Sequence, residues 1–423
     1  MTPPPAANSL RHPAVDPVQW LLDPSVLFLN HGSFGSCPRT VLEFQGRLRE
    51  RLERQPVRFL LREFEGLWDD ARAAVAEFVG AGTEDIVFVP NATTGVNTVL
   101  RSLRFQPGDE LLVTNQEYNA CRNALDLVAN QAGARVVVAD VPFPLRSEDQ
   151  VLAAIVERVS PRTRLLLCDH VTSQTGLVLP IRRIVHEMTA RGIDTLVDGS
   201  HAPGMVPLNL REIGAAYYTG NCHKWMCAPK SCAFLQVARE RQELIRPLTI
   251  SHGANSRRTD RSRFLIEFGW MGTSDPTACF SVREAIRFMG SLLPGGWPEI
   301  VQRNRELALA ARNILCEALR IESPCPDSMI GSLVSVPLPD SPPFPKPEPP
   351  LYLDLLQDRL LSEHGIEVPV IPWPAPPKRL LRVSAQLYNS LPQYESLARA
   401  IEVNHQARGR LTDPLGSTRV PRR

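Results

Sequence analysis

The chain has 423 residues, more than one ordinary hydrophobic core accommodates, which predicts two domains. A charged fraction of 22% and a net charge of only +2 are typical of a globular protein and give no reason to expect a nucleic acid or a membrane as partner. Nine cysteines without metal-ligand spacing, no secretory signal pattern and no apolar run of transmembrane length lead us to expect a cytoplasmic protein without a metal site.

The first half of the chain predicts an irregular arm over residues 1–25, a helical region over residues 41–80, and then short apolar runs alternating with helices. The expected strands are residues 86–89, 110–113, 135–138, 165–168, 195–197, 215–218 and 232–235. Continuous apolar strands separated by helices predict an α/β fold with a mostly parallel sheet covered on both faces. Ligands of such sheets bind at the carboxyl ends of the strands.

The second half of the chain predicts a smaller domain. A long helical stretch over residues 275–320 is expected to lead from a large domain, residues 26–280, into an α+β domain, residues 281–410. Strands of this domain are expected at residues 331–336 and 380–384.

Two segments of unusual composition belong to this C-terminal region. Residues 341–350 are rich in proline and are interpreted as a stiff surface insertion, with a docking ligand in polyproline form as the alternative. Residues 411–423 form a basic tail, which we interpret as a frayed, solvated segment rather than a nucleic-acid contact.

Lys224 is the most informative residue of the chain, because it lies between two apolar strand-like runs, residues 215–218 and 232–235. A lysine inside such a frame has a lowered pKa and can form a Schiff base with a carbonyl group. Asp198 ends the preceding apolar strand, where a carboxylate can pair with a protonated pyridine nitrogen. The pair predicts a site for pyridoxal 5'-phosphate (PLP).

Other residues at strand ends suit the same cofactor. Thr93, Thr94 and Gly95 stand between a strand and a helix, where hydroxyl groups and the helix dipole favour a phosphate, although a plain helix cap is the alternative. Asn221 and His223 flank the lysine and are further phosphate donors.

The remaining candidates each have an ordinary structural alternative. Tyr118 is placed to stack on the pyridine ring or to fill the core, and His201 to reach the phenolic oxygen or to serve a structural role. Ser173 ends another strand and is placed to reach the same oxygen. Arg382, in a strand of the smaller domain, suits a substrate carboxylate, with a surface ion pair as the alternative.

Taken together, the motifs follow the pattern of a known family. They are residues 28–35, 91–95, 198–204, 223–225, 270–277 and 382–384. Over about residues 25–405 the chain resembles the class V aminotransferase family of fold-type I PLP-dependent enzymes, and within it the isopenicillin N epimerase-like branch. The resemblance implies a mostly parallel seven-stranded sheet between helices, a smaller α+β C-terminal domain and a homodimer.

The resemblance also implies roles for individual residues. Lys224 would carry the Schiff base and move protons, Asp198 would pair with the ring nitrogen, and Tyr118 would stack on the ring. The residues implied near the phenolic oxygen are Ser173 and His201, and those implied at the phosphate are Thr94, Gly95, Asn221, His223 and the partner subunit's Thr273. The residues implied to meet the substrate are Arg382, at its α-carboxylate, and Asn30, His31 and Ser33, at the mouth of the site.

The reaction at the α-carbon of an amino-acid substrate stays open between several chemistries. We expect epimerisation or racemisation first, with C–S lysis and transamination as alternatives and a non-catalytic interaction protein as a remote one. The tyrosine at the stacking position, which is histidine in much of the family, matches the epimerase-like branch. Residues 362–372 lack the cysteine that the family's desulfurases use, which argues against persulfide chemistry by that route.

Overall fold

The computed structural model of the protein describes residues 7–342 and 354–411. The first six residues of the predicted arm, most of the predicted proline-rich loop and nearly all of the predicted basic tail lie outside the described residues.

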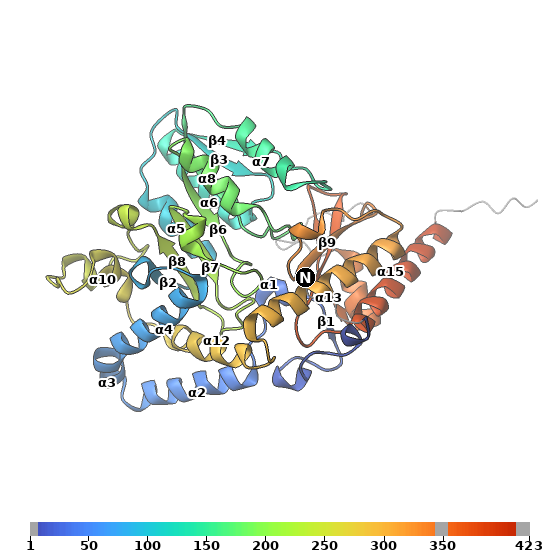
Figure 1. Cartoon of the computed structure of the whole chain (residues 1–423), viewed down its shortest axis with the longest axis horizontal. Coiled ribbons are helices and arrows are strands. Elements are labelled where there is room, and N and C mark those ends of the chain that lie inside the picture. Colours follow the sequence, from blue (N-terminus) through green and yellow to red (C-terminus); the bar gives the residue numbers. More distant parts are fainter. Residues whose placement is uncertain (1–6, 343–353, 412–423) are drawn as a thin grey trace, which may run out of the picture.

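The centre of the fold is a seven-stranded sheet in the order β2-β8-β7-β6-β5-β3-β4 (Figure 1). The strands are β2 (Ile86–Val89), β3 (Glu110–Thr114), β4 (Arg135–Ala139), β5 (Thr163–Asp169), β6 (Asp194–Asp198), β7 (Tyr217–Asn221) and β8 (Ala233–Val237). Neighbours from β4 to β7 are parallel, whereas β8 runs antiparallel to both β7 and β2. The prediction of a mostly parallel seven-stranded sheet is therefore confirmed.

Both faces of this sheet are buried, because alternate side chains along each strand enter two separate cores. Leu112 and Leu166 belong to one core, and Leu111 and Leu167 belong to the other. The first core is closed by α4 (Phe64–Val79), α7 (Glu148–Glu157), α8 (Ile181–Ala190) and α9 (Leu210–Ile213). The second is closed by α5 (Ala92–Ser102), α6 (Asn119–Ala132) and α10 (Arg263–Gly269).

The two long helical regions expected from the sequence are both interrupted. The first consists of α2 (Arg39–Arg54), α3 (Pro56–Arg58), the π-helical turn η3 (Phe59–Glu63) and α4. The second consists of α11 (Thr277–Phe280), α12 (Val282–Gly290) and α13 (Gly296–Leu319). The interruptions fall at Pro56 and near Pro294, because proline has no backbone N–H to continue a helix.

The C-terminal part is built on an antiparallel sheet in the order β11-β12-β9. Its strands are β9 (Leu333–Leu338), β11 (Val370–Pro372) and β12 (Arg379–Ser384), and its helices are α14 (Leu355–His364) and α15 (Leu391–Leu411). Helix α13 runs from beside α12 to pack along α15 (Figure 1). The expected strands of the smaller domain and its α+β character are thus present.

The N-terminal segment joins the two parts of the molecule. Strand β1 (Leu27–Phe28) pairs in parallel with β10 (Ile366–Glu367) of the C-terminal part. The short helix α1 (His31–Phe34) follows at once and lies between the two sheets in Figure 1. Six short 3-10 helices complete the described structure: η1 (Ala7–Arg11), η2 (Pro17–Gln19), η4 (Thr83–Asp85), η5 (Arg239–Leu244), η6 (His252–Asn255) and η7 (Asp327–Met329).

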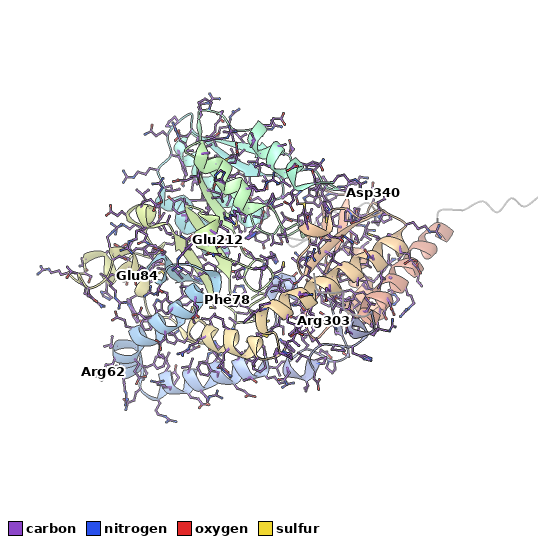
Figure 2. All side chains as sticks on the ribbon, viewed as in Figure 1. Arg62, Phe78, Glu84, Glu212, Arg303 and Asp340 are labelled. Carbon is purple, nitrogen blue, oxygen red and sulfur yellow. The ribbon has the colours of Figure 1, made fainter. Side chains whose placement is uncertain are left out.

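Charged side chains such as Arg62, Glu84 and Asp340 project from the outer surface (Figure 2). Within residues 7–342 and 354–411, none of the helices combines the length and the apolar character needed to cross a bilayer.

Glu110, the first residue of β3, is a buried carboxylate that ties three segments together. It accepts hydrogen bonds from the Ser160 hydroxyl at 2.7 Å, from Arg135 Nη2 at 2.7 Å and from Arg162 Nε at 3.0 Å. These donors hold the pKa of Glu110 below its ordinary value of 4.5. A carboxylate with a lowered folded-state pKa stabilises the fold above its unfolded-state pKa, and this stability is lost as the pH falls through the folded-state value.

Replacement of Glu110 by Gln is therefore expected to lower the free energy of unfolding at pH 7 by about 1–3 kcal/mol, the usual cost of losing charge-assisted hydrogen bonds. The difference from the wild type should shrink as the pH falls below 4.5. Denaturant titrations at pH 7 and pH 4 measure it, and a difference that is independent of pH would contradict the assignment of a charged Glu110.

Candidate active site

The candidate residues converge because parallel strands end at the same edge of a sheet. The loops that leave the carboxyl ends of β3, β5, β6 and β7 carry Tyr118, Ser173, His201 and Lys224, respectively. Arg382 reaches the same region from β12 of the C-terminal part, where it donates to Ser173. This is the place at which open α/β sheets bind ligands.

The amine of Lys224 is held in a dry environment beside an imidazole. Lys224 Nζ lies 3.0 Å from His201 Nε2. The pKa of Lys224 is lowered from 10.5 to about 8, mainly by burial and then by the charge of Arg382, while the charge of Asp198 opposes the shift. A substantial fraction of the amine is therefore neutral near pH 8, which is the form that attacks a carbonyl group.

The surroundings of His201 determine which of its nitrogens carries the proton. Burial lowers the pKa of His201 well below 6.5, with the charge of Lys224 adding to the effect, so the ring is neutral. The indole Nε1 of Trp225 donates to His201 Nδ1 at 3.4 Å. A neutral imidazole that accepts at Nδ1 carries its proton on Nε2, so His201 donates to the neutral amine of Lys224.

Asp198 is the last residue of β6, and it is 1% exposed. Its Oδ1 accepts from the backbone N–H of Ser200 at 2.9 Å and from the Ser200 hydroxyl, and its Oδ2 accepts from Cys121 Sγ at 3.2 Å. These donors fix the orientation of the carboxylate at the strand end.

The start of α5 forms a polar cradle next to the lysine loop. Asn91 caps the helix by accepting from the backbone N–H of Thr94 at 2.8 Å and from its hydroxyl at 3.0 Å. Asn221 Oδ1 accepts from the N–H of Ala92 at 2.9 Å, which ties the helix to the end of β7. A Cβ on Gly95 would overlap the side chain of Thr219, so glycine permits this close packing. The positive end of a helix at this place favours an anion.

The other phosphate candidates are placed differently. Thr93 is half-buried in the first turn of α5. His223 Nδ1 lies 3.0 Å from the carbonyl oxygen of Cys232, and burial lowers the pKa of this histidine to about 4. Thr273 is exposed in the loop between α10 and α11, and among the described residues it makes no hydrogen bond to the other candidates. A single chain does not bring Thr273 into the site.

Arg382 is a buried cation, 4% exposed. Its Nη1 donates to the carbonyl oxygen of Ser173 at 2.6 Å, and its Nη2 donates to the hydroxyl of Ser33 at 2.7 Å. No carboxylate among the described residues forms an ion pair with it, and its Nε is unpartnered there. Burial lowers the pKa of Arg382 to about 10, and the nearby Tyr118 opposes the shift. The alternative of a surface ion pair does not describe this residue.

The N-terminal segment supports the site from the other side. Asn30 is buried and accepts a hydrogen bond from the Ser33 hydroxyl at 2.5 Å. His31 is also buried, with Nδ1 2.8 Å from the Tyr388 hydroxyl and Nε2 3.1 Å from the carbonyl oxygen of Lys224. The His31 ring therefore braces the lysine loop, whereas Tyr118 is 44% exposed at the opening of the site.

Three acidic or thiol groups next to Asp198 were not singled out from the sequence: Glu117, Cys121 and Asp169. All three are buried. Asp169 ends an apolar strand, as its register partner Asp198 does, and this similarity was the signal that could have identified it. Glu117 precedes Tyr118 in a loop, and nothing in the local pattern marks it as buried.

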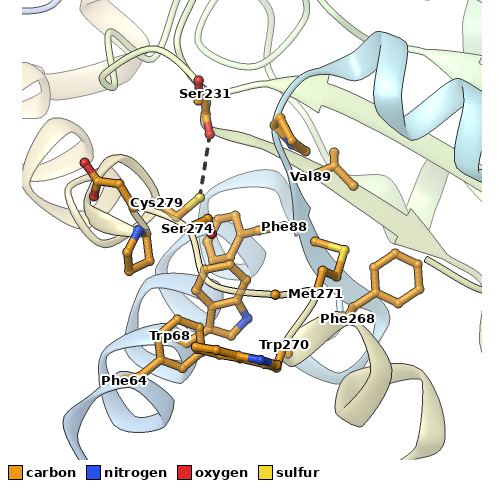
Figure 3. A pocket seen from close by; sticks show the side chains of 15 residues that line it. Phe64, Trp68, Phe88, Val89, Ser231, Phe268, Trp270, Met271, Ser274 and Cys279 are labelled. Atoms are coloured by element: carbon orange, nitrogen blue, oxygen red, sulfur yellow. Dashed lines mark hydrogen bonds between the residues drawn. The ribbon is translucent and has the colours of Figure 1, made fainter. Parts of the chain in front are cut away.

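A separate aromatic pocket of about 300 Å³ lies at the end of β2 (Figure 3). Its walls include Phe64, Trp68, Phe88 and Trp270, and Cys279 Sγ lies 3.9 Å from the carbonyl oxygen of Ser231 at one side. None of the predicted cofactor residues lines it. The pocket is therefore distinct from the site around Lys224, although neighbours of Thr273 form part of its rim.

Comparison with known proteins decides the family. A family model described as aminotransferase class-V matches residues 55–340. The chain belongs to this family. Enzymes of this family depend on PLP, so the cofactor predicted from the sequence is confirmed.

Similar proteins in this family are named for several different reactions. The chain is 35% identical to an isopenicillin N epimerase from Amycolatopsis lactamdurans, over 90% of this chain and 96% of that one. It is 30% identical to a probable chloroplastic L-cysteine desulfhydrase from Arabidopsis thaliana, over 90% and 83%, and 30% identical to a hercynylcysteine sulfoxide lyase from Schizosaccharomyces pombe, over 75% and 82%. The fold matches that of the cysteine desulfurase CsdA from Escherichia coli with a TM-score of 0.72 at 20% identity, over 95% and 99%.

The donor set fits PLP. The cofactor needs an uncharged lysine, an acid for its ring nitrogen and an anion site for its phosphate. The chain offers the partly neutral amine of Lys224, the oriented carboxylate of Asp198 and the capped start of α5 at one sheet edge. Arg382, a buried cation without an acidic partner among the described residues, is left to meet a further anion.

Gly35 tests the packing that holds the lysine loop in place. Its φ is +69°, and a Cβ there would overlap the carbonyl oxygen of His223 and lie 2.9 Å from Lys224 Cα. Gly35→Ala is expected to displace Lys224 and to weaken PLP binding at least about tenfold, because strain of this kind costs about 1–3 kcal/mol. Gly46→Ala, in α2 with no atom within 4 Å of the new Cβ, is the matched control and should keep its PLP affinity. Equal PLP dissociation constants for both variants would contradict the packing argument.

Proposed function

We propose that this protein is a PLP-dependent enzyme that epimerises or racemises the α-carbon of an amino acid or an amino-acid-derived substrate. The observation that carries the proposal is Arg382, whose buried guanidinium has no acidic partner among the described residues. A buried charge is costly unless it is paired, so a ligand carboxylate supplies the missing counter-ion. The distance from Arg382 to Ser173 and Ser33 shows that the side chain is already oriented.

Each residue around this carboxylate site then has a task. Bound PLP supplies an electron sink that makes the Cα–H bond of an attached amino acid acidic. The neutral amine of Lys224 would accept the Cα proton on one face of the substrate, and the Nε2–H of His201 positions that amine. With PLP bound, the Asp198 carboxylate would pair with the ring nitrogen, Tyr118 would cover the ring, and Ser173 would reach the phenolic oxygen.

The phosphate and the substrate side chain are assigned to the surrounding segments. In this proposal the phosphate is held by Thr93, Thr94, Gly95, Asn221 and His223. Asn30 and Ser33 line the substrate mouth, and His31 supports it from behind the lysine loop. The protein is proposed to act as a homodimer, because Thr273 is exposed in one chain and would reach a phosphate only from the partner subunit.

Epimerisation is placed first for two reasons. The epimerase relative is the more similar in sequence and is matched over nearly its whole length. Inversion also needs a second proton-transfer group besides Lys224, and both Tyr118 and His201 are near the substrate carboxylate site. Tyr118, at the opening, can exchange protons with solvent, whereas His201 is committed to Lys224.

A C–S lyase is the second candidate, because the desulfhydrase and sulfoxide lyase relatives span most of the chain. β-Elimination requires the same removal of the Cα proton by Lys224 and only a good leaving group on the substrate. Transamination is the third candidate, and a non-catalytic interaction protein is a remote fourth.

The test follows the Cα proton. Purified holoenzyme is incubated in heavy water with a panel of amino acids, peptides and cysteine conjugates, and products are followed by NMR and chiral chromatography. The proposal predicts deuterium at Cα with inversion and without ketone formation. Release of pyruvate and ammonia would instead make the protein a C–S lyase.

Two variants assign the roles. Lys224→Ala should abolish Cα exchange with every substrate, because it removes the amine that lies beside His201. Arg382→Gln should lower kcat/KM by about ten- to hundredfold, the cost of losing charge-assisted hydrogen bonds to the carboxylate. An unchanged kcat/KM in Arg382→Gln would contradict the proposal that Arg382 binds the substrate carboxylate.

A further inference from the structure

Asp198 belongs to a cluster of buried acids, and the proposed PLP site uses only Asp198 from this cluster. We call Glu117, Asp169 and Asp198, together with Cys121, the acid cluster. Asp169 and Asp198 are register partners at the ends of β5 and β6, Glu117 leaves the end of β3, and Cys121 is in the first turns of α6. All four side chains are at least nine-tenths buried.

Glu117 is the unusual member of this cluster. It is 6% exposed, and neither of its carboxyl oxygens has a hydrogen-bond partner among the described residues. One of its oxygens, Cys121 Sγ and a carboxylate oxygen of Asp198 all lie within 4.8 Å of one another. An acid buried without a partner is costly in its charged form, so this position favours the protonated form of Glu117.

The charges that face Glu117 decide its protonation. Burial, followed by the charge of Asp198, raises the pKa of Glu117 well above 4.5, whereas the backbone N–H of Tyr118 and the charge of Arg122 on α6 oppose the shift. Asp169 on β5 has its pKa raised in the same way, by burial first and then by Glu117 and Asp198. The remaining neighbours are thiols, Cys121 and Cys168, whose pKa values are also raised by burial, and the amine of Lys224.

We propose that Glu117 is a positioning residue of the cofactor site, whose protonated carboxyl group donates a hydrogen bond to the Asp198 carboxylate and keeps it ionised opposite the ring nitrogen. The inference rests on the proposed PLP site. Asp198 then receives hydrogen bonds from Ser200, Cys121 and Glu117. A carboxylate with several donors holds its charge more firmly.

A metal ion is the competing explanation for three ligand atoms so close together. It requires Glu117 ionised and Cys121 as a thiolate. Cys121 instead donates its S–H to Asp198 Oδ2 at 3.2 Å, and burial, together with the acids around it, raises its thiol pKa. The metal explanation therefore becomes an outcome of the test rather than a part of the proposal.

The first experiment measures PLP affinity in two variants of similar side-chain size. Glu117→Met removes the donor and should weaken PLP binding about ten- to hundredfold, as expected for a lost hydrogen bond to a charged group. Glu117→Gln keeps an N–H donor and should bind PLP within a few fold of the wild type. The pH dependence of the visible absorbance of bound PLP should shift in the Met variant and stay in place in the Gln variant.

The second experiment needs no cofactor and tests protonation directly, by comparing the melting temperature of the apo-protein with that of Glu117→Gln as a function of pH. An acid whose folded-state pKa is raised loses its stabilising contribution as the pH rises from its unfolded-state pKa of about 4.5 towards the folded-state value. The melting temperature of the wild type should therefore fall relative to that of the Gln variant as the pH rises above about 4.5. The Glu110→Gln control should instead be less stable than the wild type at neutral pH.

The outcomes separate the two proposals. A wild type that binds no PLP overturns the proposed function and this inference with it. A wild type that binds PLP while Glu117→Met binds it equally well overturns the inference alone. A melting-temperature difference for Glu117→Gln that is flat with pH, or a stoichiometric divalent cation found by elemental analysis that Glu117→Gln releases, also overturns it.

Discussion

Lys224 Nζ lies 3.0 Å from His201 Nε2 in an interior that disfavours a charged amine, and the rest of the site is arranged around that contact. Burial lowers the pKa of both groups, so a neutral amine faces a neutral imidazole. The indole of Trp225 sets the tautomer of the His201 ring, and the ring of His31 contacts the carbonyl oxygen of Lys224. Burial therefore favours the neutral, reactive form of the Lys224 amine, and the hydrogen bond from His201 positions it.

The N-terminal segment contacts both the C-terminal part and the lysine loop of the large sheet, and it connects the two. Strand β1 is paired to β10 of the C-terminal part. Five residues after β1 ends, the hydroxyl of Ser33 accepts a hydrogen bond from Arg382, and Gly35 packs on the lysine loop. The large sheet supplies the amine and the acids, and the C-terminal sheet supplies the cation. The site is complete only because a few residues between β1 and α2 lie in contact with both.

The sequence predicted the large sheet well, because strands buried on both faces are continuous apolar runs. It also predicted that Lys224, Asp198 and Arg382 lie in strands or at strand ends of one site, and the structure brings them together there. It did not predict the breaks at Pro56 and near Pro294 inside helical stretches, since periodicity continues across them. Glu117 was missed because burial of a loop acid depends on neighbours from β5, β6 and α6. The brace formed by His31 likewise depends on Tyr388, which is distant in the chain.

The most direct test of the account is to identify the lysine that carries PLP. The chain has only four lysines, Lys224, Lys230, Lys346 and Lys378, and Lys230 is also close to the site, with its amine 3.1 Å from the carbonyl oxygen of Gly35. Borohydride reduction of the holoenzyme followed by peptide mass mapping locates the attached cofactor. The account predicts a stoichiometric label on Lys224, and a label on Lys230, or none on any lysine, would contradict it.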